Sequence, residues 1–140
     1  EKNLKDRKVY DIGFIKQSLP SIVVEYILLI HAFLGCDTVS RVHSIGKGLE
    51  SLKKIIASKE MQICLFEFLK KDADNITISH FGEKLLCLFY DSKINVSLNS
   101  LRYRLFQRKI ATATNCIAPE SIPPTSDAAM FHSYRAYHQT

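Results

Sequence analysis

One apolar run constrains the fold of this chain more than any other feature. From Ile22 to Leu34 almost every residue is apolar, and only Glu25 and His31 interrupt the run. A helix that is apolar on nearly every face is surrounded by protein rather than lying on its surface. The run is also shorter than the roughly 20 apolar residues that a transmembrane helix needs. We therefore expect a central, buried helix that ends at Gly35, which supplies its C-cap.

The rest of the pattern predicts a mainly α-helical domain. Apolar residues recur at helical spacing in a segment that starts at Lys47 and over about 59–71, 79–90 and 98–112. Ser58 lies where an N-cap is expected, directly before the second of these segments. No internal repeat or low-complexity tract interrupts them. The fold class that follows is mainly α, with one strand at most.

The domain organisation follows from chain length and proline placement. A chain of 140 residues corresponds to one domain or to part of one. We expect 1–112 to form the helical body, in which Val9–Ile12 is a short strand or leads into a helix. We expect 113–140 to form a proline-containing loop and a last helix, N-capped by Thr125 and truncated by the end of the sequence. No signal or transit peptide is visible, and we expect a segment of a longer protein.

Charge and cysteine content set mild limits on partners and location. The net charge of +5 and the pI of about 9.1 permit an acidic partner such as nucleic acid. No C-x-x-C pair occurs, so buried, reduced thiols in an intracellular protein are expected. A nuclear location would follow only from a nucleic-acid partner. The four cysteines are Cys36, Cys64, Cys87 and Cys116.

The residues that end the apolar helix admit two interpretations. Asp37 or Thr38 can satisfy loose backbone N–H groups in the turn that follows Gly35. Alternatively, Asp37 is a metal ligand at a helix end. One carboxylate does not hold a catalytic metal pair, which needs several acids, so the other ligands would lie upstream of this sequence. His31 is expected to be a satisfied core histidine, with a place beside the metal as the alternative.

The next glycine turn is the second candidate site. It consists of Ser44, Ile45, Gly46, Lys47 and Gly48, and it opens a helix. Glycines before a helix let backbone N–H groups approach a phosphate closely, and Lys53 and Lys54 add positive charge. The segment is not a Walker loop, because G-x-x-x-x-G-K-[ST] is absent. The alternative is an ordinary tight turn with a solvated lysine face.

Both candidates fall in one stretch with a family resemblance. The run "FLGCDTVSRVHSIGKGLESLKKI" resembles the helix–two-turn–helix region, here about 28–57, of flap-endonuclease and XPG-type nucleases of the PIN-like class. In that family a Leu-Gly-Cys/Ser-Asp-Tyr segment leads, at the same distance, to Gly-Ile-Gly-Pro-Lys. The resemblance implies the helical C-terminal part of an α/β nuclease domain. In that part Asp37 binds Mg²⁺ or Mn²⁺, and Ile45 and Gly46 lie in the hairpin that holds the DNA backbone. Thr38, Ser44 and Lys47-Gly48 depart from the family pattern.

A second resemblance covers more of the chain, about 20–138. The runs "LLIHAFLGCDTVSRVHSIGKG", "SLNSLRYRLF" and "ESIPPTSDAAMFHSYRAYHQ" resemble a family of uncharacterised animal proteins of mobile-element type. That family implies no activity. The function that we expect comes from the first resemblance, which implies a nuclease-related segment that binds a nucleic-acid backbone and is inactive by itself. The alternatives are a non-catalytic nucleic-acid-binding or assembly module and a purely structural helical domain.

The segment 98–112 is basic. It contains four cationic residues and no acidic one. Two interpretations remain: the cations border a core face and extend their charged ends into solvent, or they form a second phosphate-contacting surface beside Tyr103. The cationic residues are Arg102, Arg104, Arg108 and Lys109.

Overall fold

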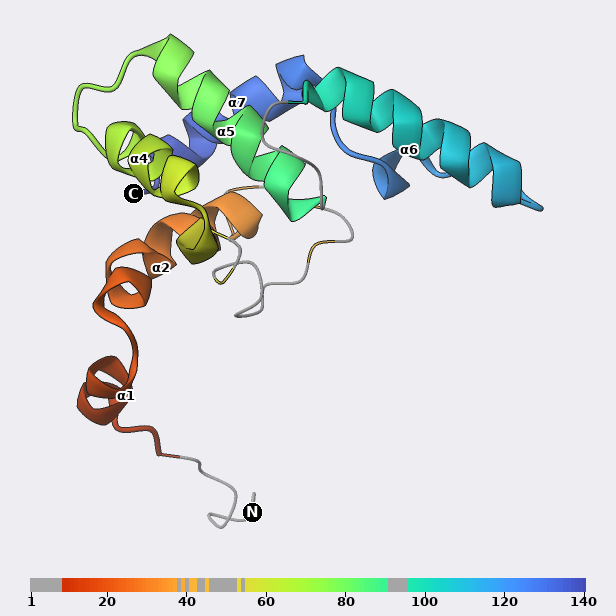
Figure 1. Ribbon diagram of the computed structural model, residues 1–140. Coiled ribbons are helices and arrows are strands. Elements are labelled where there is room, and N and C mark those ends of the chain that lie inside the picture. The colour runs from red at the N-terminus through yellow and green to blue at the C-terminus, as the bar shows by residue number, and fades with distance from the viewer. Residues whose placement is uncertain are drawn as a thin grey trace.

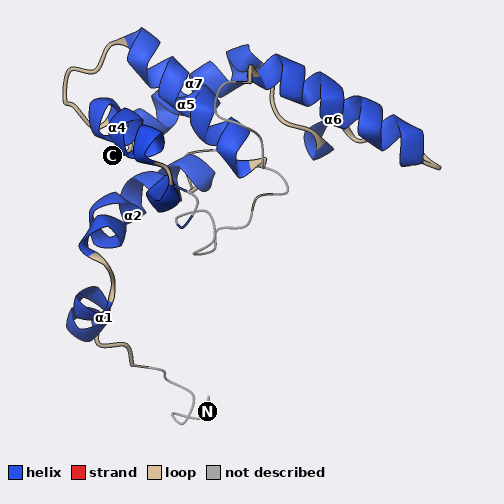
Figure 2. Cartoon of the chain, in the orientation of Figure 1, coloured by secondary structure: helices blue, strands red, loops and turns tan. Residues whose placement is uncertain are grey.

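The computed structural model describes residues 9–37, 39, 41, 42, 45, 53, 55–90 and 96–140. The labelled elements are α1 (Ile12–Ser18), α2 (Ser21–Leu34), α4 (Lys59–Phe68), α5 (Asn75–Phe89), α6 (Leu98–Thr112), the 3₁₀ turn η2 (Pro119–Ser121) and α7 (Ser126–Tyr137). Lys53 and 55–57 are helical as well. No strand occurs among the described residues (Figure 2). The mainly α fold class is thereby confirmed.

Helices α5 and α7 pack side by side and form the centre of the molecule (Figure 1). Gly82 on α5 faces α7 so closely that a Cβ atom there would lie 1.6 Å from the Oγ atom of Ser133. Ser133 is fully buried, and its hydroxyl donates to the carbonyl of Ala129 at 2.7 Å. Small residues on both helices therefore set the distance between them.

Aromatic rings from three helices fill the core. Phe33 on α2, Phe68 on α4 and Phe81 on α5 are fully buried. The ring of Phe81 lies with its centroid 6.3 Å from that of Phe33, edge to face, and 4.3 Å from that of Phe68. These contacts join α2 and α4 to the α5–α7 pair, since aromatic pairs at such spacings add attraction beyond their buried area.

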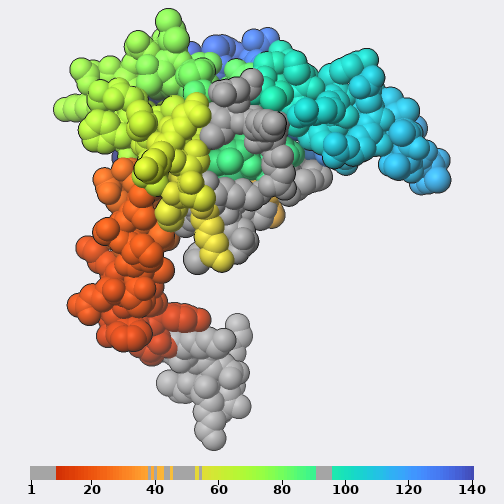
Figure 3. All heavy atoms as spheres, in the orientation of Figure 1, coloured from red at the N-terminus to blue at the C-terminus, as the bar shows by residue number. Residues whose placement is uncertain are grey.

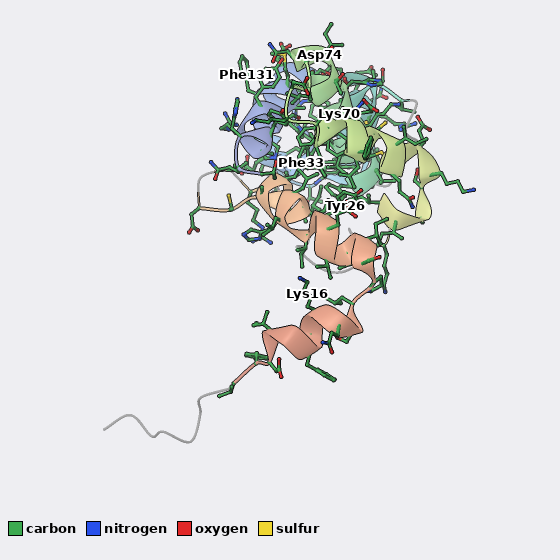
Figure 4. All side chains as sticks on the ribbon, turned by 90° about the vertical axis from the view of Figure 1, so that its left-hand side faces the viewer. Lys16, Tyr26, Phe33, Lys70, Asp74 and Phe131 are labelled. Carbon is green, nitrogen blue, oxygen red and sulfur yellow. The ribbon has the colours of Figure 1, made fainter. Side chains whose placement is uncertain are left out.

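The expectation of a central apolar helix holds only in part for α2. Val23, Leu29, Ile30 and 32–34 are buried, whereas Ile27 is 42% exposed, Leu28 is 73% exposed and His31 is exposed as well. The N-terminal half extends away from the core together with α1, in which no residue is buried (Figure 3). Figure 4 shows the same arrangement from the side, with Phe33 inside the body and Lys16 on the outlying α1.

No single described helix is both long and apolar enough to cross a membrane. The helices α1 and α2 pass that test only when taken together, across a bend of 113°.

Local capping explains most helix boundaries. The side chain of Ser58 accepts from Met61 N and that of Thr125 accepts from Ala128 N, so both predicted N-caps are confirmed. The bounds predicted for α6 are also confirmed. Helix α4 ends at Phe68, sooner than predicted. Of the two interpretations of Val9–Ile12, the lead into a helix is correct, because the side chain of Asp11 caps α1.

Helix α5 begins earlier than predicted. Its first residue is Asn75, inside the segment predicted to be a polar turn. Asp74 is the reason: its carboxylate accepts from Thr77 N at 2.6 Å. This hydrogen bond lowers the pKa of Asp74. A capped polar first turn has no apolar periodicity, so the pattern placed the start too late.

No disulfide joins the four cysteines, all of which the structure describes, and the expectation that they are buried is only partly right. Cys87 is fully buried, Cys36 and Cys64 are half-buried, and Cys116 is exposed. Burial, with a smaller contribution from the charge of Glu83, raises the pKa of Cys87 to about 11. Its Sγ atom donates to the carbonyl of Val96 at 3.2 Å. Cys87 is therefore a structural residue rather than a reactive thiol.

Candidate nucleic-acid interface

Gly35 ends α2 and determines where Asp37 lies. Gly35 has a φ of 107°, and a Cβ atom there would lie 2.4 Å from the Cα atom of Arg41. Only glycine tolerates both this backbone conformation and the close approach. The predicted C-cap is therefore confirmed. The chain leaves the buried end of α2 and reaches the surface within two residues, where Asp37 is exposed.

The described residues do not complete a metal site around Asp37. Among 9–37, 55–90, 96–140 and the isolated positions that the structure also describes, no three His, Cys, Asp or Glu side chains cluster as metal ligands would. Because paired Mg²⁺ or Mn²⁺ ions need several carboxylates, Asp37 supplies one ligand at most. The remaining ligands would have to come from outside the described residues, and we derive no reaction step through a metal.

Two of the predicted backbone-binding residues are described, Ile45 in the glycine turn and Lys53 after it. Ile45 is buried, at 7% exposure, so its side chain belongs to the core. Lys53 is exposed and lies in a helical segment. The other predicted backbone-binding residues lie outside the described residues: Ser44, Gly46, Lys47, Gly48 and Lys54. In the predicted interface Lys53 would therefore contact a nucleic acid with its side chain, whereas Ile45 would do so only through its main chain.

The core histidine is not the one that the sequence indicated. His31 lies on the exposed side of α2. His132 on α7 is instead buried, and its Nε2–H donates to the carbonyl of Phe33 at 2.6 Å. Its ring also lies edge to face with that of Phe33, with centroids 5.0 Å apart. Burial lowers the pKa of His132, so the neutral form is favoured. The one signal near it is a stripe of small residues on α7: Ala129, Ser133 and Ala136.

Helix α6 projects from the body and carries little of the core (Figures 1 and 3). Of its side chains only Leu98 and Leu101, in its first two turns, are buried. The interpretation that the cations border a core face therefore applies to the first half of α6, where Leu105 also packs, half-buried, against the core. Elsewhere on the helix, Tyr103 is 63% exposed, Phe106 is 38% exposed and Ile110 is 54% exposed.

Hydrogen bonds fix the base of α6 to neighbouring elements. Glu83 Oε1 on α5 accepts from Leu98 N at 2.7 Å, and Asn99 Oδ1 accepts from Ser126 N at 3.0 Å. Arg102 donates through Nη1 to the carbonyl of Pro123. A rigid base with an outlying, cationic and partly aromatic far half is an arrangement suited to contact with a polyanion.

Two hollows adjoin Arg102. One, of about 350 Å³, is lined by Asn99, Arg102, Tyr103, Phe106 and Ile122. The other, of about 270 Å³, lies between α5, α6, α7 and the loop that contains η2, and Arg41, Arg102 and Arg135 contribute to its wall. Sequence reasoning missed both hollows. The wall of the smaller one comes from segments that are far apart in the chain, and the wall of the larger one combines α6 with Ile122.

Comparison with known proteins identifies no family for this chain. The chain matches no protein-family model, no curated protein and no solved structure.

Proposed function

We propose that this chain binds the phosphate backbone of a nucleic acid without reading its bases. The observation that carries the proposal is α6, an outlying helix with four cationic side chains, no acidic one and exposed aromatic rings. Contacts from Arg and Lys to phosphates supply affinity that does not depend on sequence. Aromatic rings beside such cations give stacking surfaces for unpaired bases.

The glycine turn from Ser44 to Gly48, with Lys53 and Lys54, is the second contact surface in this proposal. Its sequence predicts backbone N–H groups at the start of a helix, followed by two lysines. DNA is the expected partner, because the turn is the part of the chain that resembles a DNA-backbone hairpin. Together the turn and α6 would hold a strand at two places.

The test is binding of fluorescently labelled single- and double-stranded oligonucleotides, measured by anisotropy over a series of salt concentrations. Replacing Arg108 and Lys109 with Gln should reduce the slope of log K against log salt. The reduction expected is about 0.7–0.9 for each phosphate contact removed. The charge-matched control replaces Lys16 and Lys71, both exposed, with Gln and should leave the slope unchanged. Equal slopes for both double variants would refute α6 as the binding surface.

A metal-dependent nuclease of the PIN-like class is a second candidate, favoured by one observation. The Gly35 turn brings a lone carboxylate, Asp37, from a buried helix end to the surface. In the full-length protein, Asp37→Ala should abolish cleavage that depends on Mg²⁺ or Mn²⁺ while leaving binding intact. Cleavage at the wild-type rate would rule out Asp37 as a ligand. The segment alone should not cleave.

A further inference from the structure

A cavity of about 270 Å³ lies at the base of α6, and its wall is rich in arginine. Arg41 comes from the segment after α2, Arg102 from α6 and Arg135 from α7. One acidic residue, Glu120, also contributes to the wall. The apolar part of the wall comprises Val42, Leu86, Pro119, Ile122, Pro124 and Ala128. A small hollow with an apolar floor and a few convergent polar groups is the usual form of a ligand site.

Two of the three arginines of this cavity are exposed, and the third is held at its wall. Within the part of the chain that the structure describes, Arg41 and Arg135 form no hydrogen bond or ion pair, and both are exposed. Arg102 uses one donor on the carbonyl of Pro123, which fixes its guanidinium at the wall. Since each guanidinium keeps its charge at any physiological pH, the described residues of the wall contribute three permanent positive charges and one carboxylate. The cavity therefore favours an anion.

The number of donors favours a phosphomonoester over a carboxylate. A phosphomonoester has three terminal oxygens and a charge of about −1.5 to −2 at neutral pH. Guanidinium groups bind such oxygens in pairs of parallel hydrogen bonds. Three arginines from three segments can surround three oxygens, whereas a carboxylate has only two oxygens and one charge. The cavity is also too small for a ligand much larger than a phosphate with its sugar.

The adjoining hollow indicates what the phosphate is attached to. It shares Arg102 and Ile122 with the cavity at the base of α6, here called the arginine cavity, and adds the exposed rings of Tyr103 and Phe106. A flat aromatic group attached to a phosphorylated sugar would extend from one hollow into the other and stack on these rings. Nucleotides combine these two parts.

We propose that the arginine cavity binds the phosphoryl group of a nucleotide, held by Arg41, Arg102 and Arg135, with the base against Tyr103 and Phe106. The ligand is either a free nucleotide or the phosphorylated end of a strand, because both present the same phosphomonoester. The site also gives a role to the two prolines directly before the N-cap of α7. Pro123 holds Arg102 through its carbonyl, and Pro124 lines the cavity.

The first test is calorimetric titration with adenosine 5′-monophosphate, adenosine and inorganic phosphate. The monophosphate should bind about tenfold or more tightly than either of the others. Replacing Arg41 and Arg135 with Gln should remove that preference. Replacing Lys16 and Lys71 with Gln removes the same charge outside the cavity and should preserve it. Equal binding of nucleotide and nucleoside would overturn the proposal, and so would a preference that survives in the Arg41/Arg135 variant.

Inorganic phosphate that binds as tightly as the monophosphate would overturn the assignment of a nucleotide. Thermal unfolding checks that the cavity variant is folded. If it is not, Arg41→Lys with Arg135→Lys keeps both charges but loses paired hydrogen bonding. That variant should still lose most of the preference, and a wild-type preference in it would also refute the proposal.

Oligonucleotides with a 5′-phosphate or a 5′-hydroxyl then distinguish the two sources. A preference for the phosphorylated end, lost in the Arg41/Arg135 variant, identifies strand ends as ligands. Binding of the mononucleotide without such a preference identifies the free nucleotide. The monophosphate titration does not depend on strand binding by α6, so failure of the proposed function and failure of this site give different results.

Discussion

Helices α5 and α6 have the same length, 15 residues, but owe their stability to different interactions. Helix α5 buries seven residues and contacts α4, α6 and α7. Helix α6 buries two residues, so most of its length depends on its N-cap, its backbone hydrogen bonds and intrinsic propensity. An isolated helix of this length is marginal in water. The sequence of α5 is thus constrained by packing, whereas packing constrains the far half of α6 much less.

The largest expected effect concerns the packing of α5 against α7. Gly82→Ala should destabilise the protein by about 2 kcal/mol, measured as the free energy of unfolding in urea. The new methyl group would overlap Ser133 on α7, and overpacking costs about 1–3 kcal/mol. The loss should appear although alanine favours a helix by about 1 kcal/mol relative to glycine.

Ser133→Gly should rescue that variant in part, because it removes both Ser133 atoms nearest the added methyl group. The two changes should therefore be non-additive by more than about 0.5 kcal/mol, as expected for side chains in contact. Strict additivity would show that the closeness of α5 and α7 does not depend on these two residues.

The next effect concerns His132, which joins α7 to α2. Burial holds the pKa of His132 below its ordinary value in the folded protein, so the unfolded chain binds a proton more readily. The stability contributed by neutral His132 is then complete above about pH 6.5 and is lost as the pH falls through the lowered folded-state pKa. His132→Gln keeps an N–H donor for Phe33 but does not titrate. Melting temperatures of the two proteins should converge as the pH is lowered from 7 to 5. A difference in melting temperature that stays the same at every pH would contradict a neutral, buried His132.

The smallest effect is expected on α6. The Arg108/Lys109 double variant should change the free energy of unfolding by less than about 0.5 kcal/mol, as is usual for surface substitutions. Thermal unfolding at low salt is a sufficient measurement. A loss comparable to that of Gly82→Ala would mean that α6 is part of the stable core after all, and the contrast with α5 would no longer hold.

Local features of the fold could be predicted from the sequence, and features that depend on distant segments could not. The caps at Ser58, Thr125 and Gly35 were predictable because each involves hydrogen bonds between residues three apart. The exposure of His31 and the burial of His132 were not, because they depend on how α7 lies against α2. Periodicity marks an apolar face without saying which partner covers it.

The same distinction between local and distant features applies to the candidate site. The basic character of α6 and the turn that presents Asp37 could be predicted from the sequence, because each lies within one continuous segment. The arginine cavity was not, since Arg41, Arg102 and Arg135 meet only after α6 and α7 have folded back toward the end of α2. Charge within a segment can be counted from the sequence, but charge gathered around a hollow cannot.

The hydrogen bond between His132 and Phe33 joins residues 99 positions apart. At synthesis rates of about 5–20 residues per second, Phe33 leaves the ribosome roughly 5–20 s before His132, which hydrogen-bonds its carbonyl. During that interval the apolar end of α2 and the face of α5 around Gly82 have no covering helix. The order in which the helices emerge thus gives the newly made chain a period of exposed apolar surface. In that period chaperones, rather than its own final helix, would have to shield it.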